Sequence, residues 1–354
     1  MAALTSWCIH WRPCLAGGPA NWAALWGVVF ALTDQASREP LLAKYLLRRC
    51  LLMVPVAWGA VTLVFLLMHI TPGDPALAYL GPKSGPEALA ALRHEWGLDK
   101  PLLNQYFDFL KSVVTLDFGE SLKFQNTPIK TLLAPRIPQT LSLIGVAAVF
   151  AVIMAVPLGI LAAMRKDKAG DWVVRLINAI CLGMPVFVSG YLLLILLSVK
   201  AGWFPVSGFG KTTGGHIHSL ILPGFTIGLT IVAPLAKAVR SAMVEALDSE
   251  YVAYATSKGL SRRVVVGKYA LRNSLVGAIS VLGINIGWLC GGTVAVEKVF
   301  GLSQGLGITL LDGVLGRDFP VVQVCALVFA GVVMLVFLLT DIAYSLVDPR
   351  VRLG

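Results

Sequence analysis

Six long stretches of the chain contain no Asp, Glu, Lys or Arg, and each is at least 22 residues long. They run from Cys50 to Gly73, Ile137 to Met164, Leu176 to Val199, Thr212 to Ala236, Asn273 to Val296 and Phe319 to Thr340. Roughly 20 apolar residues in a helix cross the hydrocarbon core of a bilayer. Buried helices of a soluble protein would be interrupted by charged stripes, and these stretches are not. We therefore predict an all-α polytopic membrane protein with six transmembrane helices, because a helix satisfies its own backbone in lipid.

The distribution of basic residues predicts the orientation of these spans. Six spans place both termini on one side, and that side holds 18 Lys and Arg, including the loops 165–175 and 237–272. The other side holds 11, of which seven lie in the 63-residue segment 74–136. Long loops escape the positive-inside rule, so the short loops compare as 18 against four. We predict that both termini are cytoplasmic.

Composition and charge agree with a membrane protein. Of the 354 residues, 57% are hydrophobic and only 14% are charged, against about 25% charged in soluble domains. The net charge is +10, and +9 of it lies on the predicted cytoplasmic side. The excess of basic residues therefore indicates the orientation of the chain in the membrane, where these residues lie beside lipid. It does not indicate a nucleic-acid partner.

The chain divides into five predicted regions. These are residues 1–46, an N-terminal extension ending in an interfacial helix; 47–73, the first span; 74–136, an external subdomain; 137–345, a five-span core with the cytoplasmic loop 237–272; and 346–354, a cytoplasmic tail. The uncharged stretch from Cys14 to Thr33 also carries Gly and Pro. It is a seventh span, a signal-like segment or an extension from an upstream start codon, and the last two alternatives are favoured together.

The interiors of the spans lack the groups that carry chemistry. Ionisable residues in mid-span mark ion-coupled carriers and channel filters, whereas His69, Glu297 and Asp341 lie at span ends. The six cysteines show neither metal-site nor disulfide spacing. We expect no metal, no cofactor and no catalytic residues, which argues against an intramembrane enzyme. The driving force for any transport is then supplied from outside these helices.

Small residues and prolines mark places where the spans pack closely or bend. Gly283, Gly287 and Gly291 form a doubled small-xxx-small repeat, which lets another helix approach. Packing within the chain is the favoured interpretation, and an interface with a second membrane subunit is the alternative. Kinks are expected where a span loses a backbone donor, at Pro157, Pro185 and Pro234.

The residue pattern in the loop 237–272 predicts a short amphipathic helix. An apolar stripe at helical spacing is formed by Val244, Leu247, Tyr251 and Tyr254. Lys258 followed by Gly259 is a C-terminal stop signal, and Ser261 can cap a second helix. Such a helix either docks into a groove of a soluble protein or lies flat on the membrane, and the residues alone leave both open.

The segment from Tyr251 to Gly259 also resembles the signature loop of ABC importer permeases, in the variant of the dipeptide/oligopeptide permease family. Further motifs of that family follow the same order along residues 44–352. They are Pro72-Gly-Asp-Pro75, Gly97-Leu-Asp-Lys-Pro-Leu102, Asp117-Phe-Gly-Glu-Ser121, Arg136-Ile-Pro-Gln-Thr-Leu141, Gly202-Trp-Phe-Pro205, Ile221-Leu-Pro223, Val296-Glu-Lys-Val-Phe300, Gly305-Leu-Gly307 and Asp348-Pro-Arg350. Departures are Ala253-Tyr254-Ala255 for Glu-Ala-Ala, Arg272 for Pro, and Gln304 where relatives often have Pro.

The resemblance implies the type I permease fold and a subunit of an ATP-driven importer in the bacterial cytoplasmic (inner) membrane. Its partners would be a second homologous permease subunit, two cytoplasmic ATP-binding subunits and an external solute-binding protein. The coupling helix that contacts the ATPase would comprise Tyr251, Ala253, Tyr254, Ala255, Lys258 and Gly259. Substrates of similar permeases include dipeptides, oligopeptides, glutathione, opines and nickel chelates, and the sequence does not select among them. A stand-alone channel or secondary carrier is the competing hypothesis.

Overall fold

The structure is a computed structural model that describes residues 47–70, 74–81, 84–121, 123–124, 127–210 and 212–347. The described residues from 53 to 347 belong to one compact unit, and the described part of a second unit is limited to residues 47–52. The predictions for residues 1–46 and for the tail from Asp348 onward lie outside the described residues.

Within the described residues the regular elements are helices, with one isolated bridge between Glu120 and Pro128. The first apolar helix is Leu47–Ile70. It is followed by α2 Pro75–Leu80, α3 Pro86–Glu95, α4 Leu102–Thr115, α5 Ile129–Leu133, α6 Arg136–Met164, α7 Ala169–Gly183, α8 Val186–Leu193 and the π-helical segment η1 Leu194–Lys200. Then come α9 Thr213–Leu247, α10 Glu250–Ser257, α11 Arg262–Val264, the π-helical segment η2 Val265–Ala270, α12 Leu271–Val299, α13 Leu306–Leu315 and α14 Phe319–Val347. The predicted all-α class is confirmed.

Five of these helices are long and apolar enough to cross a bilayer, and a bent pair can make a sixth span. The five are the first apolar helix, the α5–α6 segment Ile129–Met164, α9, α12 and α14. The predicted third span is not one straight helix, because α7 and the α8–η1 segment meet at 102°. Met184 is extended there and Pro185 precedes α8, as expected since a residue before proline avoids helical geometry. By contrast, α6 and α9 continue through Pro157 and Pro234.

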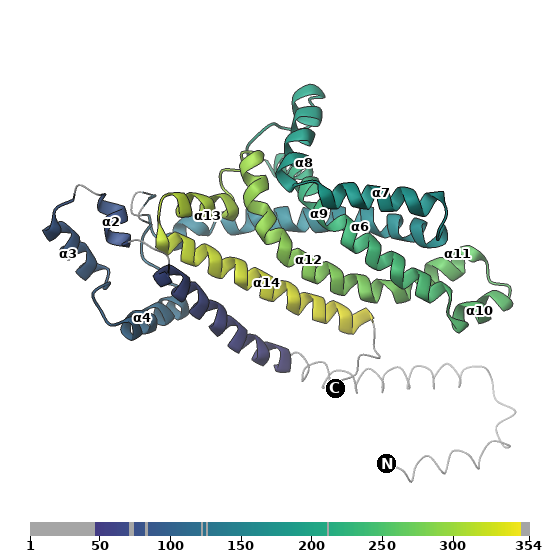
Figure 1. Cartoon of the computed structure of the whole chain (residues 1–354), viewed down its shortest axis with the longest axis horizontal. Coiled ribbons are helices and arrows are strands. Elements are labelled where there is room, and N and C mark those ends of the chain that lie inside the picture. Colours follow the sequence, from purple (N-terminus) through teal and green to yellow (C-terminus); the bar gives the residue numbers. More distant parts are fainter. Residues whose placement is uncertain are drawn as a thin grey trace, which may run out of the picture. The chain divides into compact units, whose positions relative to one another are not determined.

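The core lies where α6, α9 and α12 pack together (Figure 1). Side chains buried there include Leu143, Ile231, Leu235, Met243 and Leu289. The interface between α6 and α9 is tight, because a Cβ added at Gly159 would lie 2.7 Å from Val239 and one at Gly228 would lie 2.8 Å from the Ala147 carbonyl oxygen. Glycine here replaces side-chain packing with direct backbone approach.

The described residues of the segment 74–136 form four short helices, α2 to α5. Asp74 caps α2 by accepting from the Ala76 N–H at 3.0 Å, and Arg93 of α3 donates to the same carboxylate at 2.9 Å. Burial raises the pKa of the Asp74 carboxyl. The donors together lower it by more than burial raises it, so this pKa lies below its ordinary value. Tyr106 of α4 hydrogen bonds to Thr62 at 2.7 Å and thereby attaches α4 to the first apolar helix.

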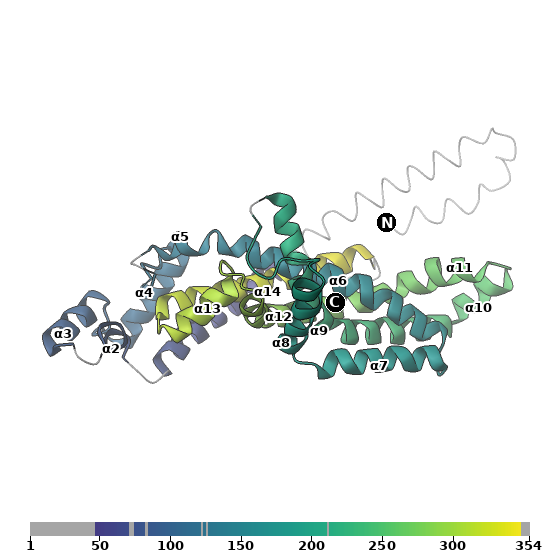
Figure 2. The ribbon, with the colours of Figure 1, turned by 90° about the horizontal axis from the view of Figure 1, so that it is seen from above.

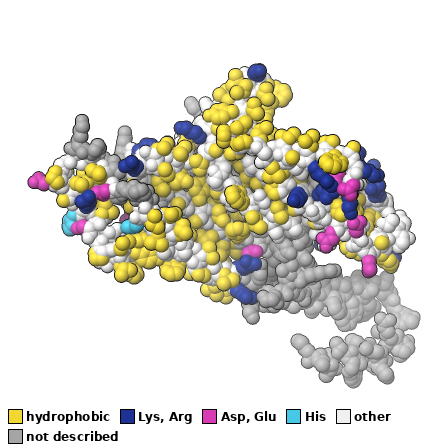
Figure 3. All heavy atoms as spheres, in the orientation of Figure 1, with side chains coloured by type: hydrophobic (Ala, Val, Ile, Leu, Met, Phe, Trp, Pro, Cys, Tyr) yellow, Lys and Arg dark blue, Asp and Glu magenta, His cyan; other side chains and the backbone are white. Residues whose placement is uncertain are grey.

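Apolar and charged side chains occupy different parts of the surface (Figure 3). Many apolar side chains of the long helices are exposed, including Leu63, Val149, Ile153, Trp288 and Leu335. Charged side chains gather at the ends of the helices, one group being at the end that carries α10 and α11. This distribution suits helices that face lipid along their length and water at their ends.

Candidate functional site

The loop between α9 and α12 folds into α10, α11 and η2, and a turn joins α9 to α10. α9 ends at Leu247, and α10 begins at Glu250 with Ser249 in an extended conformation before it. Val244 and Leu247 therefore pack against the main core on α9, while Tyr251 and Tyr254 belong to α10. The predicted continuous stripe over both pairs is wrong, because the turn at Asp248 and Ser249 interrupts the helix.

One face of α10 is buried inside the loop itself. Val252, Ala255 and Val265 form a small cluster, each at 6% exposure or less. This cluster fixes α10 against η2, the segment that leads into α12. Ala255, which we expected on the contact face of the helix, therefore supports α10 from within the loop.

The other face of α10 is open to solvent. Tyr251 and Tyr254 are 41% and 62% exposed. Ala253 on the same helix and Lys258 directly after its end are exposed as well. The Lys258 ammonium lies 4.6 Å from the centre of the Tyr254 ring, a cation–π distance that holds the ring in place. Exposed aromatic area beside a small Ala side chain is typical of a surface that another protein contacts.

Gly259 ends α10 in a Schellman motif. Its φ is +80°, its N–H donates to the Thr256 carbonyl at 3.0 Å, and the Leu260 N–H donates to the Ala255 carbonyl at 3.4 Å. Left-handed φ strains any residue with a Cβ, and the surrounding space is open. The predicted stop after Lys258 is therefore present, and the chain reverses at Gly259.

The three glycines predicted for close packing do not share one neighbour. A Cβ at Gly283 would lie 2.3 Å from the Thr340 hydroxyl of α14, and one at Gly287 would lie 3.7 Å from Val333 of α14. These two glycines lie against α14, in line with the favoured interpretation of packing within the chain, and their contact with a second subunit stays a prediction. Gly291 is exposed and has no atom within 4 Å of a Cβ placed there, which leaves it as a candidate for contact with another subunit.

A buried carboxylate lies near the start of α6, and sequence reasoning had noted it only as a residue at a span end. Glu297 is 1% exposed and accepts from the Thr140 hydroxyl at 2.7 Å and from the Ile308 N–H at 2.8 Å. A Cβ at Gly305 would lie 2.1 Å from the Glu297 carboxylate. The motifs at 296–300 and 305–307 are therefore one structure, in which Glu297 holds the start of α13.

A second buried carboxylate lies near α10. Asp171 of α7 is 0% exposed and accepts from Arg240 of α9 at 2.8 Å and 2.6 Å, one bond to each oxygen. Arg175 donates to it at 2.8 Å and the Asp167 N–H at 3.1 Å. The only sequence signal for this Asp171 cluster, formed by Asp167, Asp171, Arg175 and Arg240, was an acidic pair within the basic loop 165–175.

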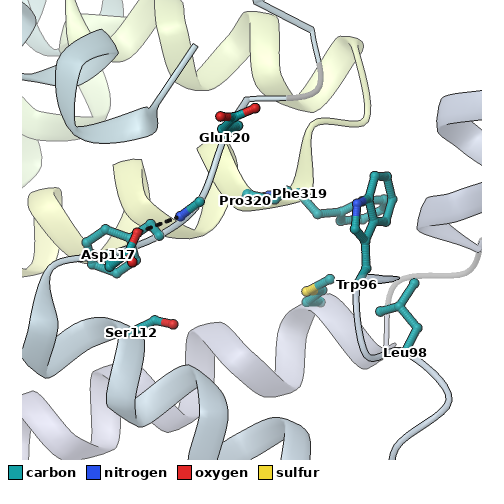
Figure 4. A pocket seen from close by; sticks show the side chains of 10 residues that line it. Trp96, Leu98, Ser112, Asp117, Glu120, Phe319 and Pro320 are labelled. Carbon is teal, nitrogen blue, oxygen red and sulfur yellow. Dashed lines mark hydrogen bonds between the residues drawn. The ribbon is translucent and has the colours of Figure 1, made fainter. Parts of the chain in front are cut away.

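A partly open hollow of about 410 Å³ lies near the other end of the bundle, where the first apolar helix, α4 and the start of α14 meet (Figure 4). Ser112 and Asp117 lie on one side of it and Trp96 and Leu98 on the other. Asp117 accepts from the Gly119 N–H at 3.4 Å. The motif Asp117–Ser121 of the segment 74–136 thus contributes to the lining of this hollow.

Comparison with known proteins gives two matches that together cover most of the chain. Residues 155–353 match the family described as binding-protein-dependent transport system inner membrane component. Residues 42–144 match its N-terminal membrane component family.

Individual relatives agree with these matches. The dipeptide transport system permease protein DppB of Lactococcus lactis is 35% identical over 312 residues, 88% of this chain and 100% of that protein. The oligopeptide transport system permease protein AppB of Bacillus subtilis is 34% identical over 316 residues, 88% of this chain and 100% of that protein. A solved inward-facing structure of the MetNI methionine ABC transporter has 20% identity and a TM-score of 0.52, over 61% of this chain and 96% of that one.

Proposed function

The chain belongs to the family of binding-protein-dependent transport system inner membrane components, and we propose that it forms half of the membrane pore of an ATP-driven importer of short peptides. It is a multi-pass membrane permease subunit rather than an enzyme. Short peptides are proposed as substrates because the two relatives above are permeases of dipeptide and oligopeptide transport systems.

The proposed assembly has four further components. A second homologous permease subunit completes the pore, two cytoplasmic ATP-binding subunits drive it, and an external solute-binding protein delivers the peptide. Both termini, α10 and α11 lie on the cytoplasmic side in this proposal, which the 18 to four distribution of basic residues in short loops supports. The segment 74–136 then lies outside and receives the binding protein.

The observation that carries the proposal is the geometry of α10. It exposes Tyr251, Ala253 and Tyr254 and rests on the cluster formed by Val252, Ala255 and Val265. The chain reverses just after it, at Gly259. A short helix with a supported inner face and an exposed aromatic outer face is suited to sit in a groove of the ATP-binding subunit. Closure of two such subunits around ATP would displace α10 and the attached spans, which gives alternating access.

Substitutions in α10 test this assignment in the assembled transporter. Tyr254→Ala removes exposed contact area, so we expect peptide-stimulated ATP hydrolysis to fall while the subunit still inserts and folds. Tyr191→Ala is the matched control, because Tyr191 is 51% exposed on α8, away from the loop. Equal ATP hydrolysis and uptake in the wild type and in Tyr254→Ala would contradict the assignment.

Gly259 provides a second variant with its own control. Gly259→Val forces a β-branched residue into left-handed φ, whereas Gly259→Asn places there a residue that tolerates this conformation. We expect the Val variant to lose assembly with the ATP-binding subunits and the Asn variant to retain most of it. Loss in both variants, or in neither, would show that the reversal at Gly259 is not what positions α10.

A further inference from the structure

The Asp171 cluster joins two helices that the chain separates widely. Asp171 lies in the first turn of α7, and Arg240 lies about two turns before the end of α9. The Arg240 guanidinium meets the carboxylate with two hydrogen bonds, from Nε at 2.8 Å and from Nη2 at 2.6 Å. Such a bidentate pair fixes both distance and orientation, which a single lysine contact does not.

Four donors of the protein reach this carboxylate, one at Oδ1 and three at Oδ2. Besides Arg240, it accepts from Arg175 in the next turn of α7 and from the Asp167 N–H in the preceding loop. The Asp171 side chain is 0% exposed, while Arg240 is 22% exposed. A buried, fully paired charge resists separation, because moving one partner leaves the other desolvated and unpaired.

The position of the cluster relates it to α10. Arg240 is on α9, and only Asp248 and Ser249 separate the end of α9 from α10. A displacement of α10 therefore reaches α9 through this short connection, as it reaches α12 through η2. α6 follows α9, since Gly159 brings the two backbones into contact near Val239.

α7 lacks comparable packing over much of its surface. It lies along α6 and α9 (Figure 2), and its outward face exposes Trp172, Val173 and Leu176 at 56% or more. Beyond its far end the chain turns by 102° into α8, whose Gly190 lies close to Thr226 of α9 and Val299 of α12. A helix held from one side needs a firm attachment if it is to move with its neighbour.

We propose that Asp171 and Arg240 are positioning residues that transmit the displacement of α10 from α9 to α7, and so to the bend that leads into α8. This inference rests on the proposed function of α10 and adds a named joint to it. In its absence, α10 and α9 would still move on ATP binding, but α7 would follow incompletely. Hydrolysis would then continue with less transport per ATP.

The test measures uptake per ATP in the complete transporter, reconstituted in liposomes, with dialanine as the probe. Asp171→Asn and Arg240→Gln remove the charge pair, and we expect dialanine uptake per ATP to fall about fivefold or more, within the usual range of coupling between sites. Basal ATP hydrolysis and the amount of assembled complex should stay near the wild-type values. A purely structural pair would instead change uptake and hydrolysis in proportion to the amount of complex.

Two control variants separate the joint from charge in general. Arg175→Gln removes a donor that lies on α7 itself and does not cross to α9. Lys166→Gln removes an exposed pair, in which Lys166 lies 3.5 Å from Asp248 at 51% and 71% exposure. Both should keep wild-type uptake per ATP. The exchange variant Asp171→Arg with Arg240→Asp should recover part of the loss, because it restores opposite charges at the same two positions.

Three outcomes would overturn the inference. The first is unchanged uptake per ATP in Asp171→Asn and Arg240→Gln, and the second is equal loss in the two control variants. The third is failure of the single and the exchange variants to assemble, which would assign the pair to folding. If the wild-type complex itself takes up no dialanine with ATP, the proposed peptide import fails rather than the joint.

Discussion

Two carboxylates are buried near opposite ends of α6, and they are satisfied in different ways. Asp171 is bound by two arginines and one backbone N–H, and Arg240 approaches it from another helix. Glu297 accepts from a hydroxyl and a backbone N–H, with no Lys or Arg among its hydrogen-bond partners in the described residues. Asp171 therefore depends on opposite charge, whereas Glu297 depends on the close approach of neutral donors.

The two carboxylates therefore suit different roles, Asp171 as a link between α7 and α9 and Glu297 as a fixed support for α13. A charge pair can fix one helix to another through side chains alone, and such pairs suit elements that move together. Glu297 instead caps the start of α13 through backbone groups that approach because Gly305 and Gly307 lack side chains. We expect this second arrangement to hold α13 rigidly against α6 and α12.

The largest effect is expected when the space beside the Glu297 carboxylate is filled. Gly305→Ala places a Cβ against the Glu297 carboxylate, so we expect the free energy of unfolding of the full chain in detergent to fall by about 3 kcal/mol. Gly331→Ala is the control, because a Cβ at Gly331 has no atom within 4 Å. Similar unfolding free energies for the two variants would show that Glu297 does not require this approach.

The next effect is expected at the charged site. Asp171→Asn keeps the shape of the side chain but leaves Arg240 without its counter-charge, which should lower the unfolding free energy by about 2 kcal/mol. Chemical unfolding of the same detergent-solubilised chain measures this loss. An unchanged free energy of unfolding would contradict this expectation. It would mean that water compensates the Arg240 guanidinium, which is 22% exposed, for the lost charge.

Glu297→Gln sharpens the comparison, because it replaces a carboxylate with an amide, as Asp171→Asn does, where, among the described residues, only neutral donors reach the carboxylate. The amide oxygen can still accept one of the two hydrogen bonds and no buried cation is left behind, so the expected loss is about 1 kcal/mol. The measurement is again the free energy of unfolding. A loss larger than that of Asp171→Asn would contradict the distinction between the two carboxylates.

The smallest effect is expected at the exposed pair of Lys166 and Asp248. Lys166→Gln should change the unfolding free energy by about 0.5 kcal/mol or less, because exposed ion pairs are screened. High salt should remove even this difference. A loss as large as that of Asp171→Asn would show that burial does not separate the two ion pairs near α10.

The sequence allowed the class and most of the spans to be predicted, because uncharged apolar stretches follow directly from the requirements of a bilayer. The reversal at Gly259 was also predictable, since it depends on local chemistry. Local patterns could not reveal that Ala255 faces Val265 or that Gly283 faces Thr340. These contacts join residues whose proximity is decided by the packing of separate helices.

The polar clusters show the same limit. Gln304, which stands where relatives often have Pro, accepts from the Gln139 side chain at 3.0 Å, a contact between positions 165 residues apart. Asp318 likewise accepts from the Ser121 hydroxyl at 2.6 Å, which joins the end of the Asp117–Ser121 motif to the residue just before α14. The motifs were visible in the sequence, but their partners became evident only from the fold.

The central claim is that this chain conducts peptides only as part of an ATP-driven assembly. Its most direct test compares dialanine uptake by liposomes that contain the full chain alone with uptake by liposomes that contain the complete transporter with its binding protein. We predict uptake in the complete transporter that requires ATP, and none with the chain alone. ATP-independent uptake by the chain alone would contradict the account and favour a channel or secondary carrier.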